Sequence, residues 1–236
     1  NSFYANKTLN EGLNYVTMRD GTELAMTVRL PSGKDLNDGP FPTFVEYSGY
    51  QTAAPHDAFL SFITNTSDPL APATSTAVGS IVGPLLNFAT VSVQMRGTGC
   101  SGGAFDLFGL PTTYDGYDAI ETVGNQPWVK GNKVGMGGIS FSGITQLFTA
   151  GTQPPHLAAI APMSVTDDLS SPGYPGGIFN DGFAASWIAE RASDAQPAPD
   201  GGQPWAAAMI DDGDEQCLEN QRLRLQTQDV NETLVT

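Results

Sequence analysis

The sequence predicts an α/β fold built on a mainly parallel sheet. Short runs rich in apolar and β-branched residues alternate with stretches whose apolar residues recur at helical spacing, as in right-handed βαβ units. Near the start, two alternating segments enclose Asp20-Gly21, a strong signal for an antiparallel hairpin. A chain of 236 residues that is 40% hydrophobic can bury the core that such a sheet needs.

The first half of the chain is expected to supply the hairpin and two parallel strands. The hairpin occupies one edge of the sheet. The predicted segments are hairpin strands at 13–18 and 23–30, a strand at 43–47, a helix at 76–88 interrupted at Gly83-Pro84, and a strand at 89–95.

The second half continues the alternation and then changes. The predicted segments are a helix at 113–126 capped by Thr112 or Thr113, a strand at 133–137, a helix at 144–150, a strand at 157–162, and helices at 183–191, 205–210 and 218–230. No strand signal follows Ala161. We therefore expect residues 1–165 to form the N-terminal part of a sheet domain and 166–236 an incomplete helical cap segment, with the remaining half of the sheet outside this chain.

Charge and composition exclude several functions. The formal net charge is −15, from 25 acidic and 10 basic residues, which argues against nucleic acid or an anionic membrane as partner. No apolar run approaches the roughly 18 residues of a membrane span. Two cysteines and two distant histidines give no familiar zinc spacing, and no cofactor motif occurs. We predict neither metal nor cofactor. Cys100 and Cys217 are compatible with a disulfide or with two free thiols.

The segment Gly138-Ile139-Ser140-Phe141-Ser142-Gly143 carries the clearest chemistry. It joins a predicted strand to a predicted helix, and a serine between small residues at such a turn is typical of a nucleophile elbow. The turn exposes the hydroxyl and aims the first N–H groups of the helix at the group it attacks. The chain is therefore a candidate serine hydrolase. It departs from the usual pattern in one respect, because the position two residues after the serine is usually glycine and is Ser142 in this chain.

An ordered series of segments resembles the X-Pro dipeptidyl-peptidase and cocaine-esterase-like branch of the α/β-hydrolases, which includes α-amino-acid ester hydrolases and glutaryl acylases. The resemblance covers roughly residues 13 to 190, and this branch has its second glycine one place later, as here. The similar segments are Val16–Leu24, Arg96–Gly103, Asp115–Glu121, Gln126–Trp128, Gly138–Gly143, Pro154–Leu157 and Pro175–Gly177.

The resemblance implies an α/β-hydrolase fold and a role for three residues. Ser140 is the nucleophile of an acyl-enzyme, and the backbone N–H of Phe141 and the hydroxyl of Tyr50 hold the oxyanion. The family's aspartate and histidine come from strands after the cap, so we expect a companion C-terminal polypeptide of the same precursor to supply them. Substrates implied are esters, X-Pro peptides and acyl amides, and the low charge fraction suggests a secreted or cell-envelope bacterial protein.

Other chemistry-bearing residues have structural alternatives. His156 is expected at the far edge of the sheet, about 15 Å from the serine. His56 follows Tyr50, on the edge of the sheet expected to carry the site, and is a candidate for the base, although it precedes the serine where the family's histidine follows it. Asp167-Asp168, Asp211-Asp212 and Asp214-Glu215 are solvated turns or an acidic rim for an amino group, and Phe183, Trp187 and Trp205 pack the cap or line an acyl pocket. The competing function is a non-catalytic binding or assembly subunit.

Overall fold

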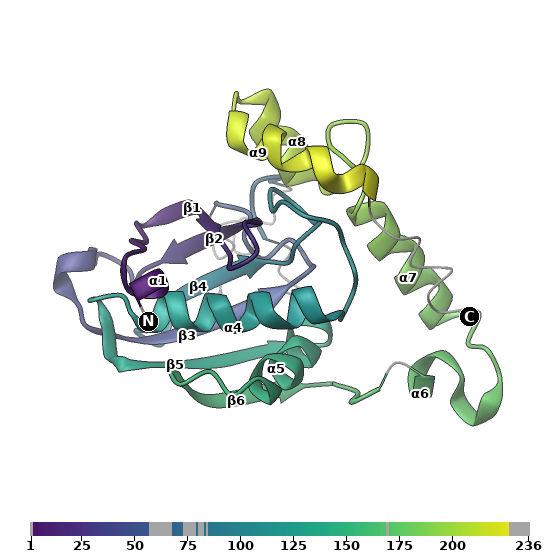
Figure 1. Cartoon of the computed structure of the whole chain (residues 1–236), viewed down its shortest axis with the longest axis horizontal. Helices are drawn as coiled ribbons and strands as arrows, with labels where there is room; N and C mark the ends of the chain where they lie inside the picture. Colours follow the sequence, from purple (N-terminus) through teal and green to yellow (C-terminus); the bar gives the residue numbers. More distant parts are fainter. Residues whose placement is uncertain are drawn as a thin grey trace.

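The computed structural model describes residues 2–56, 68–72, 79, 83, 85–168 and 170–226. Within these residues one six-stranded sheet has the order β1-β2-β4-β3-β5-β6 (Figure 1). Its strands are β1 (Gly12–Thr17), β2 (Glu23–Arg29), β3 (Phe41–Ser48), β4 (Ala89–Gln94), β5 (Val129–Ile139) and β6 (Leu157–Met163). The β1–β2 hairpin is antiparallel and forms one edge, whereas β4, β3, β5 and β6 are parallel, as predicted. The helix expected over 76–88 lies largely outside the described residues.

Two helices cover one face of the sheet. They are α4 (Leu110–Gly124) and α5 (Phe141–Gly151), which contact each other (Figure 1). The N-cap of α4 is Gly109 and not a threonine, because Pro111 already stands in the first turn and Thr112 is helical. The short α1 (Ser2–Ala5) packs on α4, and a 3₁₀ turn, η1 (Leu36–Asp38), precedes β3.

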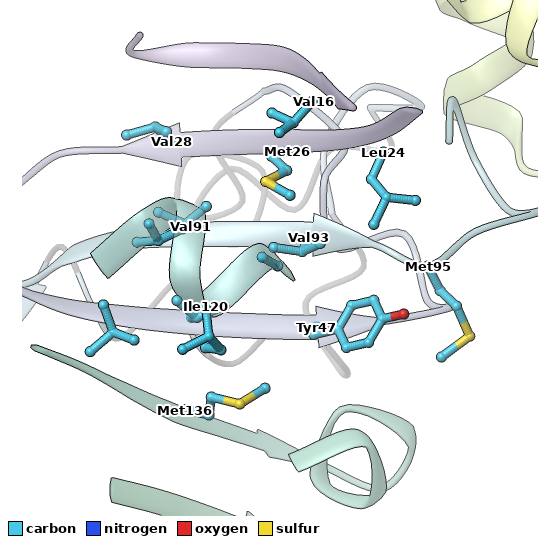
Figure 2. Close-up of a cluster of buried hydrophobic side chains, with 14 of the residues drawn as sticks. Val16, Leu24, Met26, Val28, Tyr47, Val91, Val93, Met95, Ile120 and Met136 are labelled. Atoms are coloured by element: carbon cyan, nitrogen blue, oxygen red, sulfur yellow. The ribbon is translucent and has the colours of Figure 1, made fainter. Parts of the chain in front are cut away.

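The hydrophobic core lies between α4 and the sheet. Ile120 on α4 faces Val91 and Val93 on β4 and Met136 on β5, and each is at most 2% exposed (Figure 2). Burial of four such side chains contributes about 1.5–3 kcal/mol each. The parallel strands are therefore fixed relative to one another, and their carboxyl ends meet at one edge.

Among the described residues only helices follow β6. They are α6 (Ser170–Gly173), η2 (Pro175–Gly177), α7 (Phe183–Asp194), α8 (Pro204–Asp211), α9 (Glu215–Asn220) and η3 (Gln221–Gln226). The polar helix predicted over 218–230 is thus wrong in its bounds: Asp214 caps an earlier start by accepting from the N–H of Cys217, and the α-helix ends at Asn220. Gln221 turns inward to donate to the carbonyl of Gly99, which accompanies the tighter 3₁₀ turn. Residues 227–230 lie outside the described part.

The helices α8 and α9 pack on the Gly-rich loop after β4 and on the hairpin (Figure 1). Cys100 in this loop and Cys217 on α9 form a disulfide, which decides between the two alternatives left by the sequence. Trp205 on α8 is fully buried beside them, against Gly99. The last helices are therefore tied to the sheet domain rather than extending freely from it.

Candidate active site

Ser140 occupies a sharp turn between β5 and α5. Its backbone has φ 59° and ψ −118°, a conformation that residues with a side chain rarely adopt. The turn is held from both sides, because the N–H of Ser140 donates to the carbonyl of Met163 at 2.9 Å and its carbonyl accepts from Gly143 and Ile144 at 2.8 Å. The predicted strand–turn–helix context is therefore present.

Small residues are required around this turn. A Cβ on Gly138 would overlap the hydroxyl of Ser142, and a Cβ on Gly143 would lie 2.7 Å from the carbonyl of Met163. Ser142 fills the place usually held by glycine. Its Oγ accepts from the N–H of Ile139 at 3.1 Å and donates to the buried Glu46 at 3.2 Å. The later glycine and the extra serine thus form one compact turn.

Tyr50 and Phe141 lie beside the serine. The Tyr50 hydroxyl, just after β3, is 3.2 Å from Ser140 Oγ. Phe141 is the first residue of α5, where backbone N–H groups have no partner inside the helix. Its fully buried ring packs edge-on against the Tyr50 ring at 5.4 Å. The structure thus brings together the three residues that the sequence selected, while their catalytic roles stay predictions.

A cavity of about 300 Å³ opens in front of Ser140. Its lining is mostly apolar and comes from α5, the segment after β6, and α6 and α7. The lining residues are Ser140, Ile144, Ser164, Val165, Thr166, Pro172, Gly173, Phe183, Ala184, Trp187 and Ile188. Of the three aromatic pocket candidates, Phe183 and Trp187 belong to it, whereas Trp205 belongs to the packed cluster that includes Cys100 and Cys217.

Helix α7 adds two contacts to Tyr50 that the sequence reasoning missed. The indole N–H of Trp187 donates to the Tyr50 hydroxyl at 3.1 Å. One helical turn later, the Arg191 guanidinium lies 4.9 Å from the centroid of the Tyr50 ring and 3.1 Å from Asp194. Burial raises the pKa of Asp194 to about 6, against the opposing effects of Arg191 and Gln203. The i, i+4 spacing of Trp187 and Arg191 was the available signal.

Neither histidine reaches the serine turn. His56, thought to lie on the edge that carries the site, is half-exposed, pairs with Asp68 at 2.9 Å, and has its carbonyl against the Arg29 guanidinium. It is absent from the residues that line the cavity. Arg29 ends β2 opposite Thr90, at the amino end of β4, so His56 as the base is wrong.

His156 precedes β6 and pairs with Glu121 of α4 at 2.9 Å. Its carbonyl accepts from the N–H of Val134, six residues before Ser140 on β5. Six residues of strand span about 20 Å. The expected structural role of His156, away from the serine, is therefore what the contacts show.

Two residues of the acidic pairs, Asp168 and Asp214, have structural contacts. Asp168 accepts from Ser170 and Ser171, which lowers its pKa to about 2 on the exposed surface. Asp214 accepts from Cys217 and from the hydroxyl of Tyr15. None of the acidic pairs lines the cavity in front of Ser140.

The described residues hold neither a candidate metal site nor a candidate membrane-spanning helix. No group of three or more His, Cys, Asp or Glu side chains there could hold a metal ion. In the same residues, no helix has the length and apolar character to span a bilayer.

Comparison with known proteins agrees with this geometry. Residues 20–235 match the X-Pro dipeptidyl-peptidase (S15 family). Over 209 residues the chain is 32% identical to cocaine esterase of a Rhodococcus species, which covers 84% of this chain and 32% of that protein. A crystal structure of a CocE/NonD family hydrolase from Staphylococcus aureus superposes with a TM-score of 0.63 at 21% identity, covering 95% of this chain and 35% of that one.

The chain therefore spans about a third of the length of these two relatives. The structural likeness confirms the predicted α/β-hydrolase fold for the part that the chain contains, and the sequence matches confirm the predicted resemblance. With a serine raised at the strand-to-helix turn and a family match over residues 20–235, the chain belongs to the X-Pro dipeptidyl-peptidase (S15) family of serine esterase- and peptidase-type hydrolases.

Proposed function

We propose that the complete protein cleaves an ester or amide bond through an acyl-enzyme on Ser140. One observation carries the proposal: Ser140 Oγ lies in a constrained turn, 3.2 Å from the Tyr50 hydroxyl, at the start of α5 and on the wall of a cavity. A nucleophile, an oxyanion donor and room for an acyl group thus meet at one point.

The chemistry follows from these positions. Ser140 Oγ attacks the carbonyl carbon and passes its proton to a base, and the carbonyl oxygen becomes an oxyanion. The Tyr50 hydroxyl and the Phe141 N–H donate to that oxyanion. The tetrahedral intermediate expels the alcohol or amine, which takes the proton from the base, and water then releases the acid from Ser140 by the same steps.

We infer that the base and its orienting carboxylate come from polypeptide outside this chain. Both histidines in the chain are engaged elsewhere, with Asp68 and Glu121. The chain also matches only about a third of its relatives' length, which leaves room for a further part of the protein or a companion chain. The disulfide supports an oxidising compartment outside the cytoplasm.

The cavity lining favours an uncharged acyl group. No carboxylate occurs among the residues that line it, so the part of the site described here offers no partner for a substrate ammonium. Cocaine esterase, one of the relatives, is named for an ester substrate. We therefore propose esters ahead of X-Pro peptides and acyl amides.

A fluorophosphonate label tests the proposal on the full-length protein. We expect the label on Ser140, and we expect Ser140→Ala to abolish both labelling and ester hydrolysis while the free energy of unfolding changes by less than about 1 kcal/mol. Ser186→Ala, on the exposed side of α7, is the matched control that keeps both. Undiminished hydrolysis by Ser140→Ala would refute the mechanism, and a folded wild type that never labels would favour the binding subunit.

A further inference from the structure

Among the residues that the structure describes, two polar atoms lie within hydrogen-bonding distance of the Tyr50 hydroxyl, and their chemistry favours one direction for its proton. One neighbour is the indole nitrogen of Trp187 at 3.1 Å, and the other is Ser140 Oγ at 3.2 Å. An indole N–H only donates, so the phenol oxygen must accept from Trp187. The single phenol proton is then left for the side of Ser140, which is where an oxyanion forms.

The Tyr50 ring is also held and polarised. Phe141 packs edge-on against both Tyr50 and Trp187, with ring centroids 5.4 and 5.2 Å apart. The Arg191 guanidinium lies over the Tyr50 ring at 4.9 Å. A cation over the ring draws electron density from the phenol and makes its O–H a stronger donor. A hydrogen bond that the phenol oxygen accepts also strengthens the one that its O–H donates.

We propose that Trp187 and Arg191 are positioning residues for the oxyanion hole: Trp187 directs the Tyr50 proton toward the reacting oxygen, and Arg191 makes that proton a stronger donor. The inference rests on the proposed function. Helix α7 then contributes to catalysis as well as lining the cavity, because both of these side chains act through Tyr50.

The alternative is that Trp187 only packs or only forms the acyl pocket. The two roles differ in one respect. A residue that acts through the Tyr50 hydroxyl loses its effect when that hydroxyl is removed, whereas a pocket or packing residue keeps its effect. A double-mutant cycle between Trp187 and Tyr50 therefore separates them.

The cycle uses the full-length protein, Trp187→Phe, Tyr50→Phe and the double variant. The readouts are kcat and KM for p-nitrophenyl acetate, whose acetyl group is too small to need the pocket, and the labelling rate of Ser140 by a small fluorophosphonate. We expect Trp187→Phe to lower kcat about five- to tenfold, the worth of one hydrogen bond, with KM within about twofold. In the Tyr50→Phe background the same change has no further effect.

Arg191 is tested in the same way. Arg191→Met, which keeps length but removes charge, lowers kcat about two- to fivefold in the wild type and has no effect with Tyr50→Phe, while Arg191→Lys restores most of the loss. Trp128→Phe is the matched control, because Trp128 is buried just before β5, at the opposite end of that strand from Ser140. It lowers thermal stability and leaves kcat unchanged.

The outcomes separate the inference from the function beneath it. If Trp187→Phe is equally harmful with and without the Tyr50 hydroxyl, or raises KM alone, the positioning role is refuted while the acyl-enzyme mechanism stands. If the wild type is not labelled at Ser140 and the Ser140→Ala variant keeps its activity, the proposed function is refuted, and the inference with it.

Discussion

The turn at Ser140 and the region around Cys217 differ in backbone conformation, in the exposure of their apolar side chains and in hydrogen bonding. Ser140 has a positive φ and borders a cavity, and Phe183 across that cavity is 67% exposed. Around Cys217, Trp205 is fully buried, and the Gly99 carbonyl accepts from both Gln221 and Arg224. The first region combines a strained backbone with an apolar cavity wall, whereas in the second Cys217 and Trp205 are fully buried.

The difference indicates that the contacts that stabilise the fold are concentrated away from the serine turn. Residues in sparsely populated backbone conformations persist only where their surroundings over-determine them, and they concentrate at functional sites. The disulfide and the paired polar groups of α8 and α9 lie away from the cavity, so they can fix the end of α7 without filling the site. Three experiments test this division, beginning with the largest expected effect.

Removing the disulfide should lower stability and leave the serine turn intact. The bond joins residues 117 apart in sequence, and a loop of this length is worth about 5 kcal/mol in the chain-entropy model. We expect Cys100→Ala with Cys217→Ala to reduce the free energy of unfolding by about that amount, measured by urea denaturation.

The labelling rate of Ser140 distinguishes the two regions in that variant. Below the unfolding transition it should change by less than about twofold, because Met163 and Gly143, which hold the turn, lie outside the tied cluster. A folded double-cysteine variant whose serine no longer labels would show that the regions are not independent.

Asp194 lies between the two regions and gives a pH-dependent test. Its carboxylate pairs with Arg191 on the site side, Glu190 also faces that guanidinium, and Gln203 approaches from the segment before α8. Its pKa is raised to about 6 from 3.8, so the folded state binds the proton more readily than the unfolded state. As pH rises from about 4 to about 6, this group therefore destabilises the fold by about 2 kcal/mol.

The comparison variant is Asp194→Asn, which cannot titrate. The unfolding free energy of the wild type should fall relative to that of the variant between pH 4 and about pH 7, most of it below pH 6, and the difference should then stay constant to pH 8. Parallel stability curves across this range would mean that the carboxylate is as well solvated in the folded chain as in the unfolded one.

The serine turn was readable from sequence because its determinants are local. Gly138 and Gly143 are both within three residues of Ser140, and each is needed where a Cβ would collide with the turn. The sheet and its hairpin edge followed in the same way, from alternation and from the Asp20-Gly21 signal. Tyr50 came only from the family resemblance, since nothing in its own neighbourhood distinguishes it from a loop tyrosine.

Contacts between distant segments were the part that sequence could not supply. Trp187 and Trp205 are both tryptophans in the predicted cap and look alike in the sequence. Trp187 donates to Tyr50, which is 137 residues away in the chain, whereas Trp205 packs in the cluster that contains the disulfide. Cys100 and Cys217 carry no spacing rule that decides pairing. His56 was misplaced because its proximity to Tyr50 in sequence says nothing of the direction the loop takes.

The smallest expected effect concerns the strain at Ser140 itself. At φ 59° and ψ −118° a side chain is unfavourable, and glycine adopts positive φ without that penalty. Ser140→Gly should therefore be about 1 kcal/mol more stable than Ser140→Ala, because both lack the hydroxyl and differ mainly in the Cβ. The same two substitutions at Ser186, inside helix α7, should give the opposite order, since glycine in a helix costs about 1 kcal/mol relative to alanine. Thermal unfolding of the four variants measures both differences. If glycine destabilises equally at the two positions, the turn holds no backbone strain, and the contrast between a strained site and a relaxed, tied end of the molecule is lost.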